Sequence, residues 1–411
     1  MVVDICAGWL PVEEKIGELK ISRSHGKEIL AVAYDKNWLK AHQVMLDPDL
    51  SLYSGVQYPY GKDTFGFLSD AMPDRWGRKL IEKEEQLQAD REKRPIRTLT
   101  DADYLFKLSD KLRYGGIRFR NPDTGRYYSD TGADIPPLTD LRMLEEAVHD
   151  YELSDQDANA LRILIEQGSS LGGARPKANV QDQNGALWIA KFPSKKDDYD
   201  VGAWEMAEHE LAVKCGLDVP DAKIMRLSEQ GSTFLIKRFD RDDSRNRIHL
   251  MSAMTALGMT DGNTDGASYL DLAGQIEQMS ATPDKDLREL WKRMVFNVLT
   301  SNCDDHLRNH GFILREDGWH LSPAFDLNPN IQKDAMSLNI TDNDNRKNVC
   351  NAISVSELFR VPEGEAKEIV QNMQALILDN WKQLASQYRI PEKDMAVMAS
   401  AFRECNREII P

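Results

Sequence analysis

The sequence predicts an α+β fold, and three observations support this prediction. Strand-like segments separated by Pro and Gly turn signals fill most of the first 60 residues. From residue 168 onward a glycine-rich turn, a strand, a helix, a second strand, several helices and a polar loop follow one another. From about residue 362 the chain has helical periodicity to its end, broken near Pro391.

The N-terminal elements end near residue 150, where we place a domain boundary. Residues 27–35 predict a strand, and residues 64–86 have helical spacing that Pro73 should interrupt. A strand at 112–120 and helices at 139–152 and 154–167 follow, and Ser154 and Asp157 fit a capping box for the second helix. The predicted domains are therefore an N-terminal subdomain, 1–150, and a core with a helical C-terminal part, 151–411.

Composition excludes several classes of protein. The 411 residues are 41% apolar and 29% charged, which is typical of a soluble globular chain. A net charge of −15 argues against binding nucleic acid without a partner. The five cysteines are scattered and form no CxxC pair, and no apolar run approaches 18 residues. We therefore expect a cytoplasmic protein with reduced thiols, no membrane span and no structural zinc.

The glycine-rich turn could cradle an anion. Residues 168–180, GSSLGGARPKANV, contain enough glycine and serine for backbone N–H groups to surround a phosphate. The segment is neither a Walker A motif nor a kinase GxGxxG, so a plain tight turn is an equal alternative.

A lysine follows this turn on an apolar strand. Lys191 in LWIAKFP either points outward from an edge strand or meets an anion such as a nucleotide phosphate. In the second case a glutamate on the next helix would hold it, and Glu205 is favoured over Glu208.

The polar loop TSNCDDHLRNHGF, 300–312, carries the strongest chemical signal. Asp304 and Asn309 have the D-x-x-x-x-N spacing with which protein kinases place a catalytic Asp and a Mg²⁺ ligand. His306 and His310 raise the alternative of a transition metal, although hard oxygen ligands suit Mg²⁺ better. A third interpretation is a loop whose side chains only cap backbone groups.

An aspartate in SPAFDLNP, Asp326, lies seventeen residues after Asn309. Taken alone it could belong to an ordinary turn. It also occupies the place of a DFG-type metal-binding Asp, although FDL is not DFG. The order of glycine loop, strand Lys, helix Glu, D-x-x-x-x-N and Asp is what a nucleotide-dependent phosphotransferase of the protein-kinase-like fold needs.

With these motifs in place, the chain resembles the HipA-type serine/threonine kinases, the toxins of bacterial HipBA toxin–antitoxin modules. The segments SSLGGARPKA, IAKFP, FLIKRFDRD, CDDHLRNHGF and PAFDLNP carry the resemblance, together with AYDKNWL and FGFLSDAMPDRWGR near the N-terminus. The resemblance implies a bilobal, PI3/4-kinase-like fold with an N-terminal α/β subdomain and a mostly helical C-terminal subdomain.

The resemblance also implies residue roles and the cofactors ATP and Mg²⁺. Asp304 would be the catalytic base, Asn309 and Asp326 the Mg²⁺ ligands, and Ser170 a serine whose autophosphorylation silences the kinase. On position alone Ser169 is a near-equal candidate for this modification. The remaining nucleotide-binding positions would be Ser169, Leu171, Gly172, Gly173, Ala174, Lys191, Glu205, Lys237, Phe239 and His306.

Members of the family phosphorylate translation factors such as aminoacyl-tRNA synthetases and are held by a small DNA-binding, HipB-like antitoxin. We therefore expect DNA contact only through or alongside such a partner, and a role in persistence. Two alternatives stay open: an inactive ATP-binding regulator that acts as a co-repressor scaffold, and a small-molecule kinase of the aminoglycoside or choline type.

Overall fold

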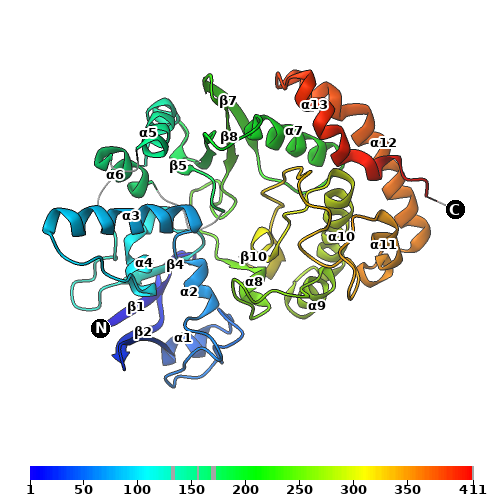
Figure 1. Ribbon diagram of the computed structural model, residues 1–411. Helices are drawn as coiled ribbons and strands as arrows, with labels where there is room; N and C mark the ends of the chain where they lie inside the picture. The colour runs from blue at the N-terminus through cyan, green and yellow to red at the C-terminus, as the bar shows by residue number, and fades with distance from the viewer. Residues whose placement is uncertain (131–134, 155–156, 168–172, 410–411) are drawn as a thin grey trace. The chain divides into compact units, whose positions relative to one another are not determined.

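A computed structural model describes residues 1–130, 135–154, 157–167 and 173–409 (Figure 1). The chain divides into two compact units. The first unit comprises Met1–Lys195 and Lys237–Thr260, and the second comprises Lys196–Ile236 and Asp261–Pro411. Residues on both sides of position 150 lie in the first unit. The domain boundary expected there stays a prediction.

The first unit contains a four-stranded antiparallel sheet in the order β3-β2-β1-β4. A separate antiparallel hairpin joins β5 and β6. The strands of this unit are β1 (Val2–Ala7), β2 (Glu14–Ser24), β3 (Lys27–Tyr34), β4 (Ile117–Arg120), β5 (Lys177–Gln181), β6 (Leu187–Lys191) and β9 (Leu250–Ser252).

Local sequence signals mark two helix starts in the first unit. Pro73 separates α2 from α3, as expected, and Thr100 and Asp103 form a capping box on α4. The helices are α1 (Lys36–Ala41), α2 (Gly66–Asp70), α3 (Arg75–Glu92), α4 (Asp101–Lys107), η1 (Asp110–Leu112), η2 (Leu138–Asp140), α5 (Leu141–Leu153), α6 (Ala158–Glu166) and α8 (Ala253–Ala256).

The capping box expected at Ser154 is wrong. Asp157 is itself the N-cap of α6, and its carboxylate accepts from the backbone N–H groups of Asn159 and Ala160. Ser154 is the C-cap of α5 instead. The sequence pattern placed the start of α6 three residues too early, because Asp is as good an N-cap as Ser.

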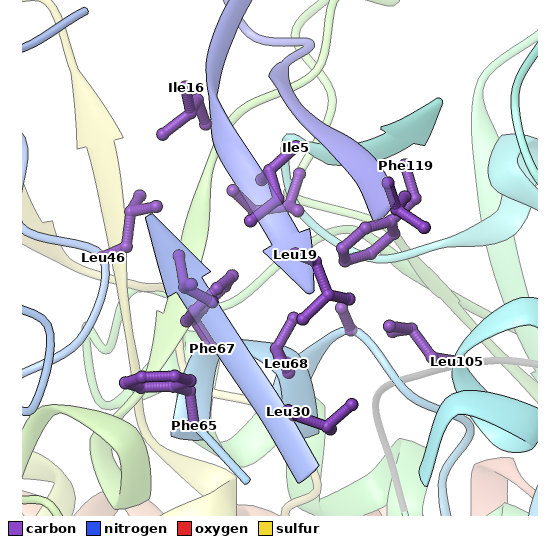
Figure 2. Close-up of a cluster of buried hydrophobic side chains, with 14 of the residues drawn as sticks. Ile5, Ile16, Leu19, Leu30, Leu46, Phe65, Phe67, Leu68, Leu105 and Phe119 are labelled. Atoms are coloured by element: carbon purple, nitrogen blue, oxygen red, sulfur yellow. The ribbon is translucent and has the colours of Figure 1, made fainter. Parts of the chain in front are cut away.

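A hydrophobic core supports the four-stranded sheet (Figure 2). Side chains from the strands pack against side chains from α2, α4 and the loop before α2, and all of them are buried. Burial of each such side chain contributes about 1.5–3 kcal/mol relative to exposure. The side chains labelled in the figure are Ile5, Ile16, Leu19, Leu30, Leu46, Phe65, Phe67, Leu68, Leu105 and Phe119.

The second unit is mostly helical and contains two antiparallel hairpins, β7–β8 and β10–β11. Its strands are β7 (Ala222–Ser228), β8 (Gly231–Lys237, whose last residue belongs to the first unit), β10 (Gly311–Arg315) and β11 (Gly318–Leu321). Its helices are α7 (Val201–Lys214), α9 (Tyr269–Met279), α10 (Pro283–Thr300), η3 (Leu307–Asn309), α11 (Val349–Ser354), η4 (Ser356–Phe359), α12 (Glu363–Gln387), α13 (Glu392–Met398) and η5 (Ala399–Asn406).

Helix α10 positions the polar loop. Pro283 fills its first position, where the missing N–H costs nothing, and Ser301 ends it with a left-handed φ of 54°. Its apolar residues, including Leu290, Trp291 and Met294, are completely buried. The polar loop therefore begins at the end of a helix that is firmly packed in the core.

Two expectations from composition can be compared with the structure. All five cysteines lie within the described residues, and none forms a disulfide. None of the helices in the described parts of the chain combines the length and the apolar character needed to cross a membrane.

Candidate active site

The structure separates the two adjacent aspartates of the polar loop, which the sequence could not do. The loop leaves α10 after Thr300, passes through the short helix η3 and enters β10. Asp304 and Asp305 follow one another in this loop, but the Asp304 side chain is 60% exposed whereas Asp305 is 3% exposed. The two carboxylates therefore cannot have the same role.

Asp305 is held by a buried polar network. Its Oδ2 accepts hydrogen bonds from His310 Nε2 (2.8 Å), from Asn297 Nδ2 (2.9 Å) and from the Tyr269 hydroxyl. Burial opposes ionisation of Asp305, but the neighbouring His310 and the donated hydrogen bonds outweigh it and lower the pKa. Asp305 therefore fixes the shape of the loop from inside.

Asp304 is the carboxylate that solvent and a substrate can reach. Its Oδ1 forms an ion pair with Lys333 Nζ, and both side chains are substantially exposed. An exposed pair of this kind contributes about 1 kcal/mol or less, so a hydroxyl group can displace it. A carboxylate that is accessible and mounted on a rigid loop is what proton acceptance requires.

Asn309 is oriented by the same loop. Its Nδ2 donates to the backbone carbonyl of Asp304 at 3.3 Å. This contact uses the donor end of the amide, so its Oδ1 is the end suited to accept from a ligand or bind a metal. The five-residue spacing thus gives a direct contact between the two positions.

The segment that carries Asp326 is tied to the start of the loop. Asn330 N–H donates to the Ser301 carbonyl at 2.9 Å, and Asn328 N–H donates to Asn302 Oδ1 at 3.4 Å. Asp326 itself has a left-handed φ of 61°. This conformation is unusual outside glycine, although Asp tolerates it better than most residues.

The oxygen donors in this unit fit Mg²⁺ better than a transition metal. Asn309 Oδ1 and the Asp326 carboxylate are hard ligands of the type Mg²⁺ prefers, with phosphate oxygens and water completing the coordination. His310 is already bonded to Asp305 through Nε2. Across the described ranges, no group of three or more His, Cys, Asp or Glu side chains is arranged to hold a metal ion.

His306, expected near the nucleotide, directly precedes η3. Its backbone carbonyl accepts a hydrogen bond from Asn309 N–H at 2.8 Å, which closes the short helical turn between His306 and Asn309. The backbone of His306 therefore helps to fix the conformation of the loop.

Helix α7 carries two buried glutamates with different character. Glu205 and Glu208 are 2% and 1% exposed. Burial raises the pKa of Glu208 to about 8, so Glu208 is mostly protonated at neutral pH. A neutral carboxyl group cannot act as the anionic partner of a lysine, which favours Glu205 for that role.

In the first unit, the described end of the glycine-rich turn is fixed by a buried ion pair. Lys177 Nζ bonds Asp74 Oδ2 at 2.9 Å and the Gly173 carbonyl at 2.8 Å. The other Asp74 oxygen caps α3 by accepting from Gly77 N–H at 2.8 Å. Lys177 therefore anchors the turn instead of offering its charge to a ligand.

The rest of the turn is only partly described. Ala174 is exposed at its end. Ser169, Ser170, Leu171 and Gly172 lie outside the described residues, so their expected roles stay predictions.

Lys191 is buried, which rules out the interpretation that it points into solvent from an edge strand. It lies on β6 opposite Lys177 in the β5–β6 register and is only 8% exposed. Two lysines facing each other would repel, and Asp74 neutralises Lys177. A buried ammonium group at Lys191 is favourable only with an anionic environment.

The segment expected to meet adenine, Lys237–Phe239, rests on a buried ion pair. Arg238 makes two hydrogen bonds to Asp240, Nε–Oδ1 at 2.9 Å and Nη2–Oδ2 at 2.8 Å, and both side chains are inaccessible to solvent. Phe239 packs edge-on against Tyr114 with ring centroids 5.8 Å apart. The Lys237 side chain is 34% exposed, and its Nζ lies 3.9 Å from Asp243 Oδ1.

The predicted residues thus fall into two groups. The structure places Asp304, His306 and Asn309 in one loop of the second unit, joins the Asp326 segment to that loop's beginning, and buries Glu205 on α7. The first unit carries Gly173, Ala174, Lys191 and the segment Lys237–Phe239.

Sequence reasoning missed four supporting residues. Tyr269 and Asn297 bind Asp305, Lys333 binds Asp304, and Asp74 binds Lys177. Only Asp74 had a local signal, since Asp after Pro commonly caps a helix.

The fold and these residues define a protein of the kinase-like HipA class. The family described as the HipA-like C-terminal domain matches residues 169–381. Because this match covers more than half of the chain, the chain belongs to the HipA-like family.

Relatives with curated names are consistent with this family. The chain is 29% identical over 148 residues to "Putative kinase Y4mE" of Sinorhizobium fredii, covering 34% of this chain and 33% of that protein. It is 26% identical over 193 residues to "Putative kinase" of Haemophilus influenzae, covering 42% of this chain and 56% of that protein. The chain thus spans between one third and just over half of the length of these two relatives.

The solved structure of HipA from Shewanella oneidensis, determined in a complex with HipB and operator DNA, has the same fold. The TM-score is 0.69 at 16% sequence identity, with 98% of this chain and 95% of HipA covered. The predicted α+β, protein-kinase-like fold is therefore confirmed.

Proposed function

We propose that the chain is an ATP- and Mg²⁺-dependent serine/threonine protein kinase. The observation that carries this proposal is the difference in exposure and hydrogen bonding between Asp304 and Asp305. One carboxylate is exposed and displaceable from Lys333, and its neighbour is locked into the loop by three hydrogen bonds. A loop that only capped its own backbone would not need this arrangement.

Each group would act through a simple physical effect. Asp304 would accept a hydrogen bond from the substrate hydroxyl and then its proton, after the hydroxyl has displaced Lys333. Lys191, with Glu205 as its ion-pair partner, would bind the nucleotide phosphates. The backbone of 237–239 would bind adenine, and the turn 168–174 would cover the phosphates.

Asn309 Oδ1 and the Asp326 carboxylate would hold the metal. When bound, Mg²⁺ would neutralise charge on the phosphates of ATP. The segment that carries Asp326 is hydrogen-bonded to the start of the loop, which supports this assignment.

We further propose that Ser170 is an autophosphorylation site. A phosphoserine adds about −1.5 to −2 charge, which would repel the nucleotide phosphates and displace the turn. Since Lys177 is committed to Asp74 and Gly173, it is not available to bind the phosphoserine.

The partners follow from family membership. We propose a cytoplasmic toxin that is held by a small DNA-binding, HipB-like antitoxin and phosphorylates a translation component such as an aminoacyl-tRNA synthetase. The net charge of −15 agrees with DNA contact through the partner.

A radiolabel assay tests the activity. Purified protein, ATP and Mg²⁺ are incubated with cell extract, and the expected result is labelled protein. A labelled metabolite would indicate a small-molecule kinase. Absence of label would indicate the inactive ATP-binding regulator.

Toxicity is tested separately by expressing the chain without an antitoxin. Growth arrest is expected, with relief by Asp304→Asn. Equal growth of cells expressing either form would contradict the toxin proposal but would leave the radiolabel result standing.

A further inference from the structure

A cavity of about 310 Å³ lies in the second unit, outside the residues assigned to catalysis. Helix α10 forms one side with residues from Lys285 to Arg293, the β10–β11 hairpin forms another, and Asp218 lies at the edge. The volume is at the lower end of the range of small-molecule sites, about 300–1,000 Å³. The cavity is therefore large enough for a small ligand.

Arg293 is the unusual residue of this cavity. Its side chain is 2% exposed, and its Nε donates to Glu289 Oε1 at 2.9 Å. Its Nη1 and Nη2 are buried and have no hydrogen-bond partner among the residues that the structure describes. Leaving two buried guanidinium nitrogens unsatisfied is unfavourable, and a planar pair of this kind matches the oxygens of a phosphate.

Further cations surround Arg293. Lys285, Lys292 and Arg315 line the same cavity, and in the described part of the chain none of them forms an ion pair or hydrogen bond. Arg288 also lines it but is bonded to Glu365 and to the Arg360 carbonyl. The free cations could therefore turn toward an anion without breaking an existing contact.

Two of the three acidic residues of the lining are already hydrogen-bonded. Glu289 is engaged by Arg293 and by Asp218 N–H, and Asp286 accepts from Leu321 N–H and the Ser280 hydroxyl. Arg293 is paired with Glu289 and Arg288 with Glu365, so the lining cations that no ion pair offsets among the described residues are Lys285, Lys292 and Arg315. His320 also lines the cavity, but it is bonded to Asp317 and Thr282.

We propose that this cavity binds the phosphate dianion of a small phosphorylated molecule. Lys285, Lys292 and Arg315 supply positive charge that no ion pair offsets, and the two nitrogens of Arg293 that lack a hydrogen-bond partner have the bidentate geometry that phosphate accepts. The surplus volume leaves room for an organic group attached to the phosphate.

The test is a titration of the full chain, without nucleotide and at constant ionic strength, followed by calorimetry. The probes are inorganic phosphate, phenyl phosphate and, as a monoanionic control, benzoate. We expect saturable 1:1 binding of both phosphates and at least tenfold weaker binding of benzoate. Tighter binding of phenyl phosphate than of inorganic phosphate would assign the site to a phosphate ester, and the reverse order would assign it to free phosphate.

Charge variants locate the site. Lys292→Gln should weaken phosphate binding about fivefold, because it removes one nearby charge. Glu289→Gln keeps an acceptor for Arg293 but removes a negative charge, so it should strengthen binding several-fold. Lys393→Gln, an exposed lysine outside the cavity, is the matched control and should have no effect.

Three outcomes would overturn the proposal: no saturable phosphate binding, equal effects of Lys292→Gln and Lys393→Gln, or no gain with Glu289→Gln. Phosphate bound elsewhere, for example where ATP phosphates bind, would respond to none of the cavity variants and would count against the proposal. Because Arg293 is buried and paired with Glu289, the test uses the more exposed positions instead of Arg293 variants.

Discussion

Replacing each of the adjacent aspartates by asparagine should separate catalysis from stability. In Asp305→Asn, three hydrogen bonds to a carboxylate become bonds to a neutral amide. A bond to a charged group contributes about 1.5–3 kcal/mol and a neutral one about 0.5–1.5 kcal/mol, so each bond loses about 1–1.5 kcal/mol and the three together lower the free energy of unfolding by about 3–4.5 kcal/mol. Asp304→Asn loses only an exposed ion pair, about 1 kcal/mol or less.

The catalytic effects should have the opposite order. Asp304→Asn removes the proposed proton acceptor and should reduce the rate of phosphoryl transfer about 10²–10⁴-fold. Folded Asp305→Asn should retain much more activity, because its carboxylate does not reach the substrate. The assays are urea unfolding followed by tryptophan fluorescence and initial rates of phosphoryl transfer from ATP.

The control is Asp317→Asn, which changes an exposed carboxylate on the β10–β11 turn and should leave the rate unchanged. Near wild-type activity in Asp304→Asn would refute the assignment of Asp304. Loss of activity in Asp305→Asn without loss of stability would assign the proton acceptor to Asp305 instead.

Three other predictions follow from the site and its supports. Asp326→Ala should weaken ATP binding in the presence of Mg²⁺ and leave Mg²⁺-free binding nearly unchanged; equal affinity in both conditions would make this segment only a turn. Incubation with ATP and Mg²⁺ should place phosphate on Ser170, detected by mass spectrometry, with loss of ATP binding; an active enzyme that never modifies Ser170 would remove the switch but not the kinase. Burial opposes ionisation of Asp240, but Arg238 and Arg241 outweigh it and lower the pKa to about 2. A carboxyl group whose pKa is lower in the folded than in the unfolded protein stabilises the fold at pH values above its unfolded pKa. The free energy of unfolding should therefore decrease by about 2 kcal/mol as the pH falls from about 4 to 2. Acid unfolding of Asp240→Asn should lack this step, and an unchanged profile would contradict it.

The sequence was most informative where the signal is local. The interruption at Pro73, the strand around Lys191 and the loop between α10 and β10 follow from periodicity and turn residues within short windows. The short helix α1 was missed, because its six residues are too few to show a period.

The candidate site was harder to predict where it depends on distant partners. Nothing near Asp304 and Asp305 shows which of them is buried, since Tyr269 lies 36 residues away from Asp305. Nothing near Lys177 in the sequence indicates its counter-ion, because Asp74 is 103 residues distant. Such contacts are properties of the folded chain and have no spacing rule.

The double role of Asp74 limits how this sequence can evolve. One of its oxygens caps α3 and the other neutralises Lys177, which faces Lys191 across the β5–β6 hairpin. Losing only one member of a buried pair is far more costly than exchanging both for apolar residues. Aligned relatives should therefore show covariation at positions 74 and 177: an uncharged residue at one should accompany an uncharged residue at the other, even though position 191 remains lysine.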